Sequence, residues 1–240
     1  MTDEVAGVDG CRAGWVVAFL DAGGECRVAV VERFAEVFAG GPPAVVAVDM
    51  PIGLPERVGA AGRGPEAAVR PLLGSRQSSV FSVPSRAAVY ADDFRAGCRV
   101  ALATSEPPRM ISKQLFHIAA KIREVDGFLR GAPELSRHVF EVHPEVAFWR
   151  MNGEQALSEP KKVKGRPHGP GLAQRCDLLM AAGIAPEVID RGPPSGAAID
   201  DLLDALACAL TARRIRAGEA RPFPDPPGRD AFGLTMAIWA

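Results

Sequence analysis

The run Ala44–Val48 is the feature of this sequence that most constrains the fold. It consists of alanine and valine alone and ends at Asp49. Because no polar residue alternates within it, a strand formed here is buried on both faces, which places it in the middle of a sheet covered on both sides. A carboxylate at the buried end of such a strand needs a metal ion or a backbone donor as its partner. Asp49 is therefore a candidate functional residue.

Three short β-rich segments precede this central strand, over residues 5–9, 14–20 and 26–32. Turn residues separate them, which is the pattern of an antiparallel meander. A brief helix over 34–38 then returns the chain to the central strand, and a further strand is expected over 138–143. The sequence thus predicts an α/β fold with a mixed five-stranded sheet, in which the antiparallel meander is joined to parallel strands and helices flank the sheet.

The other segments are mainly helical. Apolar residues recur at helical spacing from Ile111 to Leu129 and predict a buried stripe. We expect a single domain over residues 1–240, with a mainly helical insertion at about 55–131 beside the candidate site. The further predicted features are helices over 92–104, 144–151 and 171–182, a polar loop over 154–170 that carries Lys161–Lys164, a terminal helix over 198–217, and a late strand or packing tail over 233–239.

Composition limits the partners and the location that the sequence predicts. The chain has 28 basic and 29 acidic residues, so its total charge does not indicate a nucleic-acid or membrane partner, although a local basic patch remains open. Its five cysteines are odd in number and never form a C-x-x-C pair, which argues against a disulfide framework and a zinc site. No apolar run approaches the ~20 residues of a membrane helix. We expect a cytoplasmic protein without a membrane partner.

Four aspartates are the candidate metal ligands. Asp9 ends the first strand at the Gly10 turn, as Asp49 ends the central strand, and Asp201 and Asp204 share one face of the terminal helix because they lie three residues apart. If the strands are neighbours and the helix packs beside them, the four carboxylates converge. Such an oxygen-rich site suits Mg2+ or Mn2+, and the chemistry most often built on two such ions is phosphodiester cleavage.

Each aspartate also has an ordinary structural interpretation. Asp9 could form an Asx turn that shapes the hairpin, and Asp201 and Asp204 could cap the terminal helix. Asp204, however, lies a turn inside the helix and precedes the small apolar run Ala205–Ala209, which is expected to pack against the sheet. Because a charge that enters such a surface is costly unless it is neutralised, Asp204 is the better metal candidate of the two.

Other residues are candidates for catalysis or for binding the substrate. Glu141 and His143 lie near the end of the strand over 138–143 and are candidate catalytic groups, although a histidine before proline is often structural. Side chains that could grip phosphate oxygens are Arg76, Ser78, Ser79, Lys113 and Lys121. A solvated surface is the equally good interpretation for any one of them.

Five motifs in order resemble a known family. They are Gly7–Trp15, Asp49–Leu54, Arg76–Phe81, Glu141–Glu145 and Asp201–Ala209. Together they resemble the DUF429 family of predicted RNase H-like nucleases, over nearly the whole chain. The helix motif and the acid at the end of the central strand are similar to the RuvC-type Holliday-junction resolvase branch of that superfamily. The resemblance implies an RNase H-like fold. The sequence departs from the RNase H prototype in one respect: the second acid of the prototype lies on a helix, whereas Asp49 ends a strand.

The leading hypothesis is a metal-dependent nuclease that acts on DNA or RNA through two Mg2+ or Mn2+ ions. Asp9 would bridge the ions, Asp49 and Asp204 would complete the pair, and Asp201 would assist. A resolvase-like role would also call for a twofold homodimer. Two alternatives stay open: a nucleotide-binding phosphotransferase of the actin-like type, although the chain is too short for two copies of that domain, and a non-catalytic RNase H-like scaffold that binds a partner.

Overall fold

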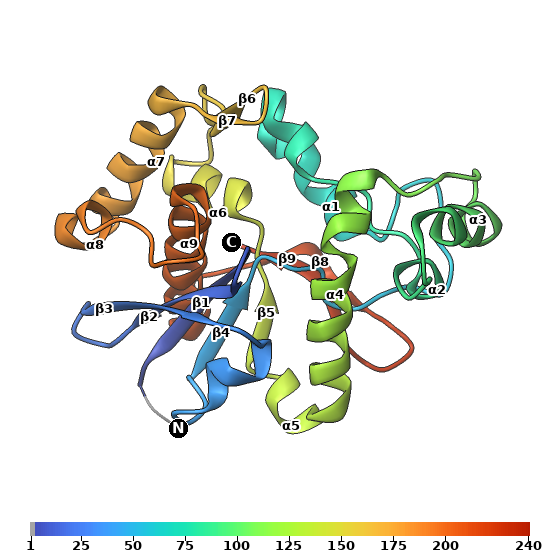
Figure 1. Cartoon of the computed structure of the whole chain (residues 1–240), viewed down its shortest axis with the longest axis horizontal. Helices are drawn as coiled ribbons and strands as arrows, with labels where there is room; N and C mark the ends of the chain where they lie inside the picture. Colours follow the sequence, from blue (N-terminus) through green and yellow to red (C-terminus); the bar gives the residue numbers. More distant parts are fainter. Residues whose placement is uncertain (1–2) are drawn as a thin grey trace.

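Seven strands form the central sheet of the structure (Figure 1). They are β1 (Val5–Cys11), β2 (Gly14–Leu20), β3 (Cys26–Val31), β4 (Val45–Val48), β5 (Val139–Glu141), β8 (Pro222–Arg229) and β9 (Thr235–Trp239). The computed structural model describes residues 3–240, and the strands of this sheet lie in the order β3-β2-β1-β4-β5-β9-β8. The first three strands pair antiparallel, whereas β4 lies parallel to β1 and β5. The predicted α/β fold, a meander joined to parallel strands, is confirmed.

The sheet has two strands beyond the predicted five. β9 forms from the late apolar stretch and lies parallel to β5, and β8 pairs antiparallel with β9 at the edge of the sheet. β8 was not predicted because its sequence, PFPDPPGR, is rich in proline. Proline cannot donate a ladder hydrogen bond, but it is tolerated on an edge strand, where only one side is paired.

Helices surround the sheet and fill the segment between β4 and β5. They are α1 (Pro65–Val69), α2 (Arg86–Val89), α3 (Phe94–Thr104), α4 (Lys113–Gly131), α5 (Pro133–Ser136), α6 (Pro144–Met151), α7 (Gly169–Ala181), α8 (Pro186–Asp190) and α9 (Ile199–Arg216), with 3-10 helices η1 (Phe34–Phe38) and η2 (Arg70–Ser79). The predicted polar loop contains a small hairpin, β6 (Lys162–Val163) and β7 (Arg166–Pro167). Within residues 55–131, the helical segments are α1, η2, α2, α3 and α4.

The two long helices α4 and α9 cover opposite faces of the sheet (Figure 1). Val8 of β1 and Val48 of β4 lie in the apolar core that includes residues of α4. Val5 of β1 and Ala47 of β4 lie in the core that α9 shares. This division follows from strand geometry, because successive side chains point to opposite faces. The central strand is therefore buried on both sides, as its sequence predicts.

Gly7 allows α9 to lie directly on β1. A Cβ atom at this position would be 2.0 Å from the backbone nitrogen of Ala209 and 2.1 Å from the carbonyl oxygen of Ala205. Both atoms belong to the helix backbone, so no side-chain rotation relieves the overlap. The stretch of α9 that faces the sheet is consequently buried over nearly its whole circumference.

We expect Gly7→Ala to destabilise the protein by about 3 kcal/mol or more, because the helix must move away from the sheet. The measurement is urea denaturation followed by circular dichroism. Gly127→Ala in α4 is the matched control, since a Cβ there meets nothing within 4 Å and alanine favours a helix by up to about 1 kcal/mol. Equal denaturation midpoints for the two variants would contradict the close approach at Gly7.

Candidate metal centre

Strand register brings Asp9 and Asp49 together. β1 and β4 run parallel with Val8 opposite Val48, and the backbone nitrogen of Asp49 donates to the carbonyl oxygen of Val8 at 2.9 Å. The two aspartates are therefore the next residues along neighbouring strands. Asp49 follows the end of β4, whereas Asp9 does not end its strand as predicted, because β1 continues to Cys11 in its pairing with β2. Successive side chains of a strand point to opposite faces of the sheet, so Asp9 points to the same face as Val5, and Asp49 to the same face as Ala47. This is the face that α9 covers.

Asp204 of α9 completes a cluster with these two residues. One carboxylate oxygen from each of Asp9, Asp49 and Asp204 can be chosen so that all three lie within 4.8 Å of one another. Asp204 is 2% exposed and its neighbours Leu203 and Ala205 are fully buried. Gly7 allows Asp204 to lie this close to the strands, because the backbone of α9 contacts β1 at Ala205, the residue after Asp204.

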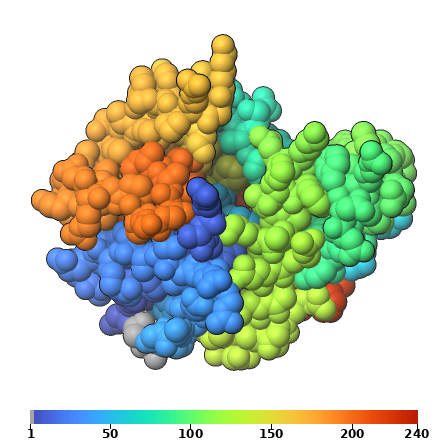
Figure 2. All heavy atoms as spheres, in the orientation of Figure 1, coloured from blue at the N-terminus to red at the C-terminus, as the bar shows by residue number. Residues whose placement is uncertain are grey.

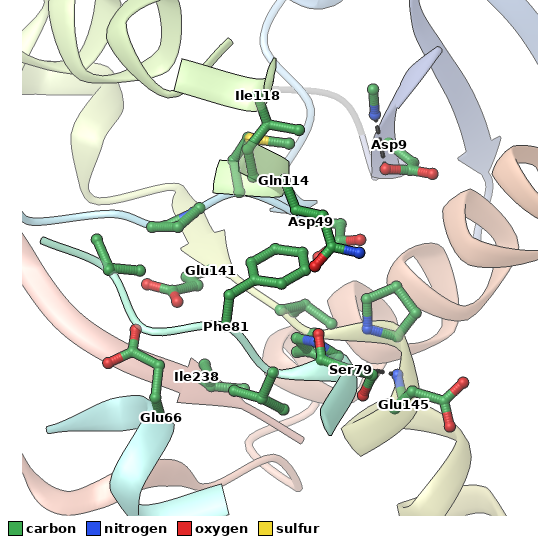
Figure 3. A pocket seen from close by; sticks show the side chains of 18 of the residues that line it. Asp9, Asp49, Glu66, Ser79, Phe81, Gln114, Ile118, Glu141, Glu145 and Ile238 are labelled. Carbon is green, nitrogen blue, oxygen red and sulfur yellow. Dashed lines mark hydrogen bonds between the residues drawn. The ribbon is translucent and has the colours of Figure 1, made fainter. Parts of the chain in front are cut away.

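The hydrogen bonds of the cluster leave room for a cation. Oδ1 of Asp9 accepts from the backbone nitrogen of Gly10 at 2.7 Å, which fixes that carboxylate (Figure 3). Oδ2 of Asp204 accepts from the ammonium of Lys161, whereas Oδ1 of Asp204 is buried without a hydrogen-bond partner. A buried carboxylate oxygen that lacks a donor is costly, and hard divalent cations prefer such oxygens. The donor set therefore fits Mg2+ or Mn2+.

Burial and mutual repulsion raise the pKa values of the three acids. Burial, and after it the negative charge of Asp204, raises the pKa of Asp49 to about 8, although Lys161 opposes the shift. The pKa of Asp9 lies well above its ordinary value for the same reasons, first burial and then repulsion from Asp49. Burial also raises the pKa of Asp204. The opposite holds for Lys161: burial lowers its pKa, but attraction to Asp204 and Asp9 outweighs burial and raises it.

Asp201, which is predicted to assist the other three aspartates, makes a capping contact in the structure. Its carboxylate accepts a hydrogen bond at 2.9 Å from the backbone nitrogen of Ala198, the residue that precedes α9. This contact is the capping arrangement that the sequence offers as the ordinary interpretation. The cluster of Asp9, Asp49 and Asp204 does not include Asp201. Its neighbour Asp200 forms an ion pair with Lys162 at 2.5 Å.

Glu141 belongs to a buried ion-pair network on the other face of the sheet from the cluster. It pairs with Arg63 and accepts from the backbone nitrogen of Ile52 at 2.8 Å, and Arg63 also pairs with Glu66. Burial raises the pKa of Glu141 to about 7, although the charge of Arg63 opposes the shift. Sequence reasoning missed Arg63, since nothing in its surroundings distinguishes it from other arginines.

His143 is fixed at the start of α6. Its Nδ1 accepts from the backbone nitrogen of Glu145 at 3.2 Å, and its Nε2 lies 3.3 Å from the carbonyl oxygen of Ser79, which requires the proton on Nε2. Burial lowers the pKa of His143 to about 4, so the ring is neutral near pH 7. Both ring nitrogens are thus already used by the backbone.

A pocket of about 490 Å3 adjoins the aspartates, and Figure 2 shows the hollow between the segments that surround it. Four of the predicted substrate-binding residues line it: Arg76, Ser78, Ser79 and Lys121. Lys113 does not, and its neighbour Gln114 takes that place (Figure 3). Lys121 donates to the carbonyl oxygen of Gly14 and lies 4.4 Å from the ring centre of Trp15, so it also supports the wall. The pocket is further lined by Phe81, Glu145 and Lys161.

The fold and the cluster together define a mixed α/β protein with a buried carboxylate site suited to a metal ion. The family model described as "Protein of unknown function (DUF429)" matches residues 7–229. The chain belongs to the DUF429 family, as its motifs predict. Neither the curated proteins nor the solved structures gave a match. Across residues 3–240, the helices include none with the length and apolar character needed to cross a bilayer.

The raised pKa of Asp49 predicts how stability depends on pH in the absence of metal. Its folded-state pKa of about 8 lies above the ordinary value of 3.8, so the folded protein binds more protons between these values. Its contribution is fully present below pH ~4 and is lost as the pH rises through 8. Glu141, with its pKa of about 7, acts in the same direction.

We therefore expect the free energy of unfolding, measured by urea denaturation in EDTA, to fall between pH 6.5 and 8.5. His143 contributes an opposite slope only at the lower end of this window, because its folded and ordinary pKa values are about 4 and 6.5. In Asp49→Asn the fall should be smaller, since the titrating carboxyl is gone. A wild-type stability that rises with pH over this range would contradict the assigned direction.

Proposed function

We propose that this protein is a metal-dependent phosphodiesterase that acts on nucleic acid. The observation that carries the proposal is the cluster of Asp9, Asp49 and Asp204, three carboxylates at one edge of the sheet with an unpartnered buried oxygen on Asp204. Repulsion among these groups opposes ionisation, and a divalent ion would remove that cost. The same arrangement offers the oxygen ligands that Mg2+ and Mn2+ require.

The chain supplies the other parts that such a reaction needs. Asp9, Asp49 and Asp204 would hold the ion, which when bound provides Lewis-acid chemistry at a phosphoryl group. The adjoining pocket would admit the backbone of the substrate next to the carboxylates. Arg76 on its wall has a guanidinium fork suited to phosphate oxygens, and Ser78 offers a hydroxyl close by. The hydroxyl of Ser79 already donates to the carbonyl oxygen of Arg76 at 2.8 Å.

Substitution of the three aspartates tests the site. We expect Asp9→Asn, Asp49→Asn and Asp204→Asn each to abolish the rise in melting temperature caused by Mn2+ and to lower cleavage by more than about a hundredfold, because loss of an outer-shell partner alone costs 10–100-fold. Thermal shift and cleavage of labelled single-stranded and duplex DNA and RNA measure the two effects. Asp201→Asn is the matched control, since an asparagine oxygen can still accept from Ala198.

The outcomes separate the proposal from its alternatives. Loss of the Mn2+ shift in Asp201→Asn, to the extent seen for the other variants, would restore a four-acid site. Absence of any Mn2+ shift in the wild type would favour the non-catalytic scaffold. Nucleotide binding by calorimetry without cleavage of nucleic acid would favour the phosphotransferase alternative.

Arg76 and Lys113 form a matched pair of basic residues for testing the substrate path. Arg76 lines the pocket and Lys113 does not. We expect Arg76→Ala to weaken nucleic-acid binding and to lower the slope of log K against log salt concentration by about one, because one phosphate contact is lost. Lys113→Ala should leave both quantities unchanged. Fluorescence anisotropy over a salt series is the measurement, and equal effects of the two variants would contradict a path through the pocket.

A further inference from the structure

The acidic residues around the cluster differ in whether a cation already neutralises them. Most have a dedicated partner: Glu145 pairs with the fully buried Arg175, Glu141 with Arg63, and Asp200 with Lys162. Asp9 and Asp49 have no ion pair with a basic side chain among residues 3–240. Within this described part of the chain, the one ammonium in contact with the cluster is that of Lys161. The local balance is thus three carboxylates against one built-in positive charge.

Lys161 is held in place by the segment that carries it. Its carbonyl oxygen accepts from the backbone nitrogen of His168 at 2.9 Å, across the β6–β7 hairpin. The preceding Pro160 is packed against α7, where a Cβ on Gly171 would lie 1.9 Å from the Pro160 carbonyl oxygen. Arg175 of α7 also donates to the carbonyl oxygen of Glu159 at 3.2 Å. The backbone on either side of Lys161 is therefore fixed, and its ammonium is directed to Asp204.

We propose that the ammonium of Lys161 is a built-in second cation of the metal centre, so that the site binds a single divalent ion. This inference rests on the proposed metal-dependent function. One oxygen of Asp204 contacts Lys161 while the other, Oδ1, is buried without a partner, and it is this second oxygen that is free for an ion.

Charge balance favours one ion over the two that four aspartates would suggest. With three carboxylates and Lys161 the site carries two net negative charges, which one divalent ion neutralises. A second divalent ion would leave an excess of two positive charges next to the ammonium, and like charges a few ångströms apart repel strongly in a buried site. Lys161 also lines the pocket, so this built-in charge lies beside the space that adjoins the carboxylates.

Manganese binding by Lys161→Met tests the proposal, because methionine keeps the length of the side chain without its charge. Calorimetry gives the number of Mn2+ ions per chain and their affinity, and electron paramagnetic resonance distinguishes a single Mn2+ from a spin-coupled pair. Lys162→Met is the matched control. Lys162 is the next residue on the same segment, but it pairs with Asp200 and not with the cluster.

We expect one uncoupled Mn2+ per chain in the wild type and in Lys162→Met. In Lys161→Met we expect the first ion to bind about tenfold tighter or more, and a second ion to give a coupled spectrum, because the repelling charge is removed. If Lys161→Met does not fold, Lys161→Gln is used in its place, since it removes the charge and keeps a hydrogen-bond donor.

Different outcomes overturn different claims. A coupled pair of ions in the wild type would overturn the role of Lys161 and leave the metal-dependent function standing. Binding by Lys161→Met alone would show that the ammonium takes the place of the ion, which also overturns the proposal. Identical stoichiometry and affinity in the wild type and Lys161→Met would do the same. Absence of Mn2+ binding in every variant would overturn the proposed function and this inference together.

Discussion

The contact between α9 and β1 at Gly7 is the constraint on which the site depends. Because Gly7 has no side chain, the backbone of the helix lies directly against the strand. The same approach carries Asp204 to the carboxyl ends of β1 and β4, where Asp9 and Asp49 lie. One packing feature therefore both closes a face of the core and assembles the three acids. Any change that lifts the helix from β1 would therefore also move Asp204 away from Asp9 and Asp49.

Buried ion pairs connect the segment between β4 and β5 to the sheet. Arg63 reaches Glu141 at the end of β5. Arg86 of α2 joins Asp126 of α4 to Asp230, which follows β8. A buried pair gains little net stability over apolar residues, but breaking one partner leaves an uncompensated charge. We infer that these arginines fix how the helical segment lies over the pocket, since each joins residues that are far apart in the sequence.

The sequence predicts the parts of this structure that depend on local pattern. The central strand and the meander follow from their apolar runs, and Asp49 follows from its position at a strand end. Asp9 does not end its strand, because β1 continues to Cys11 in the hairpin with β2. The distinction between Asp204 and Asp201 also follows in part, because the apolar run after Asp204 predicts its burial. β8 could not be predicted, since its prolines are tolerated only because the strand lies at an edge.

Long-range packing decides the residues that the sequence leaves ambiguous. Lys161 is one of several lysines in a polar loop, and it is directed to the cluster by the packing of Pro160 against α7 together with backbone contacts of His168 and Arg175. Lys113 and Gln114 are adjacent on α4, and the rotation of the helix decides which of them lines the pocket. These orientations depend on contacts between segments that are distant in the sequence. Such contacts leave no local periodicity from which they could be predicted.

The three aspartates of the cluster differ from the buried glutamates around them in how their negative charge is compensated. Glu141 and Glu145 are each matched by a buried arginine, so their burial is compensated within the fold. The three aspartates share one ammonium and repel one another. Burial and this repulsion together raise the pKa of Asp49 to about 8. In the absence of a cation, an arrangement that opposes its own ionisation loses stability as the pH rises. Its physical rationale is the cation that it can bind, with Lys161 limiting how much further positive charge the site accepts.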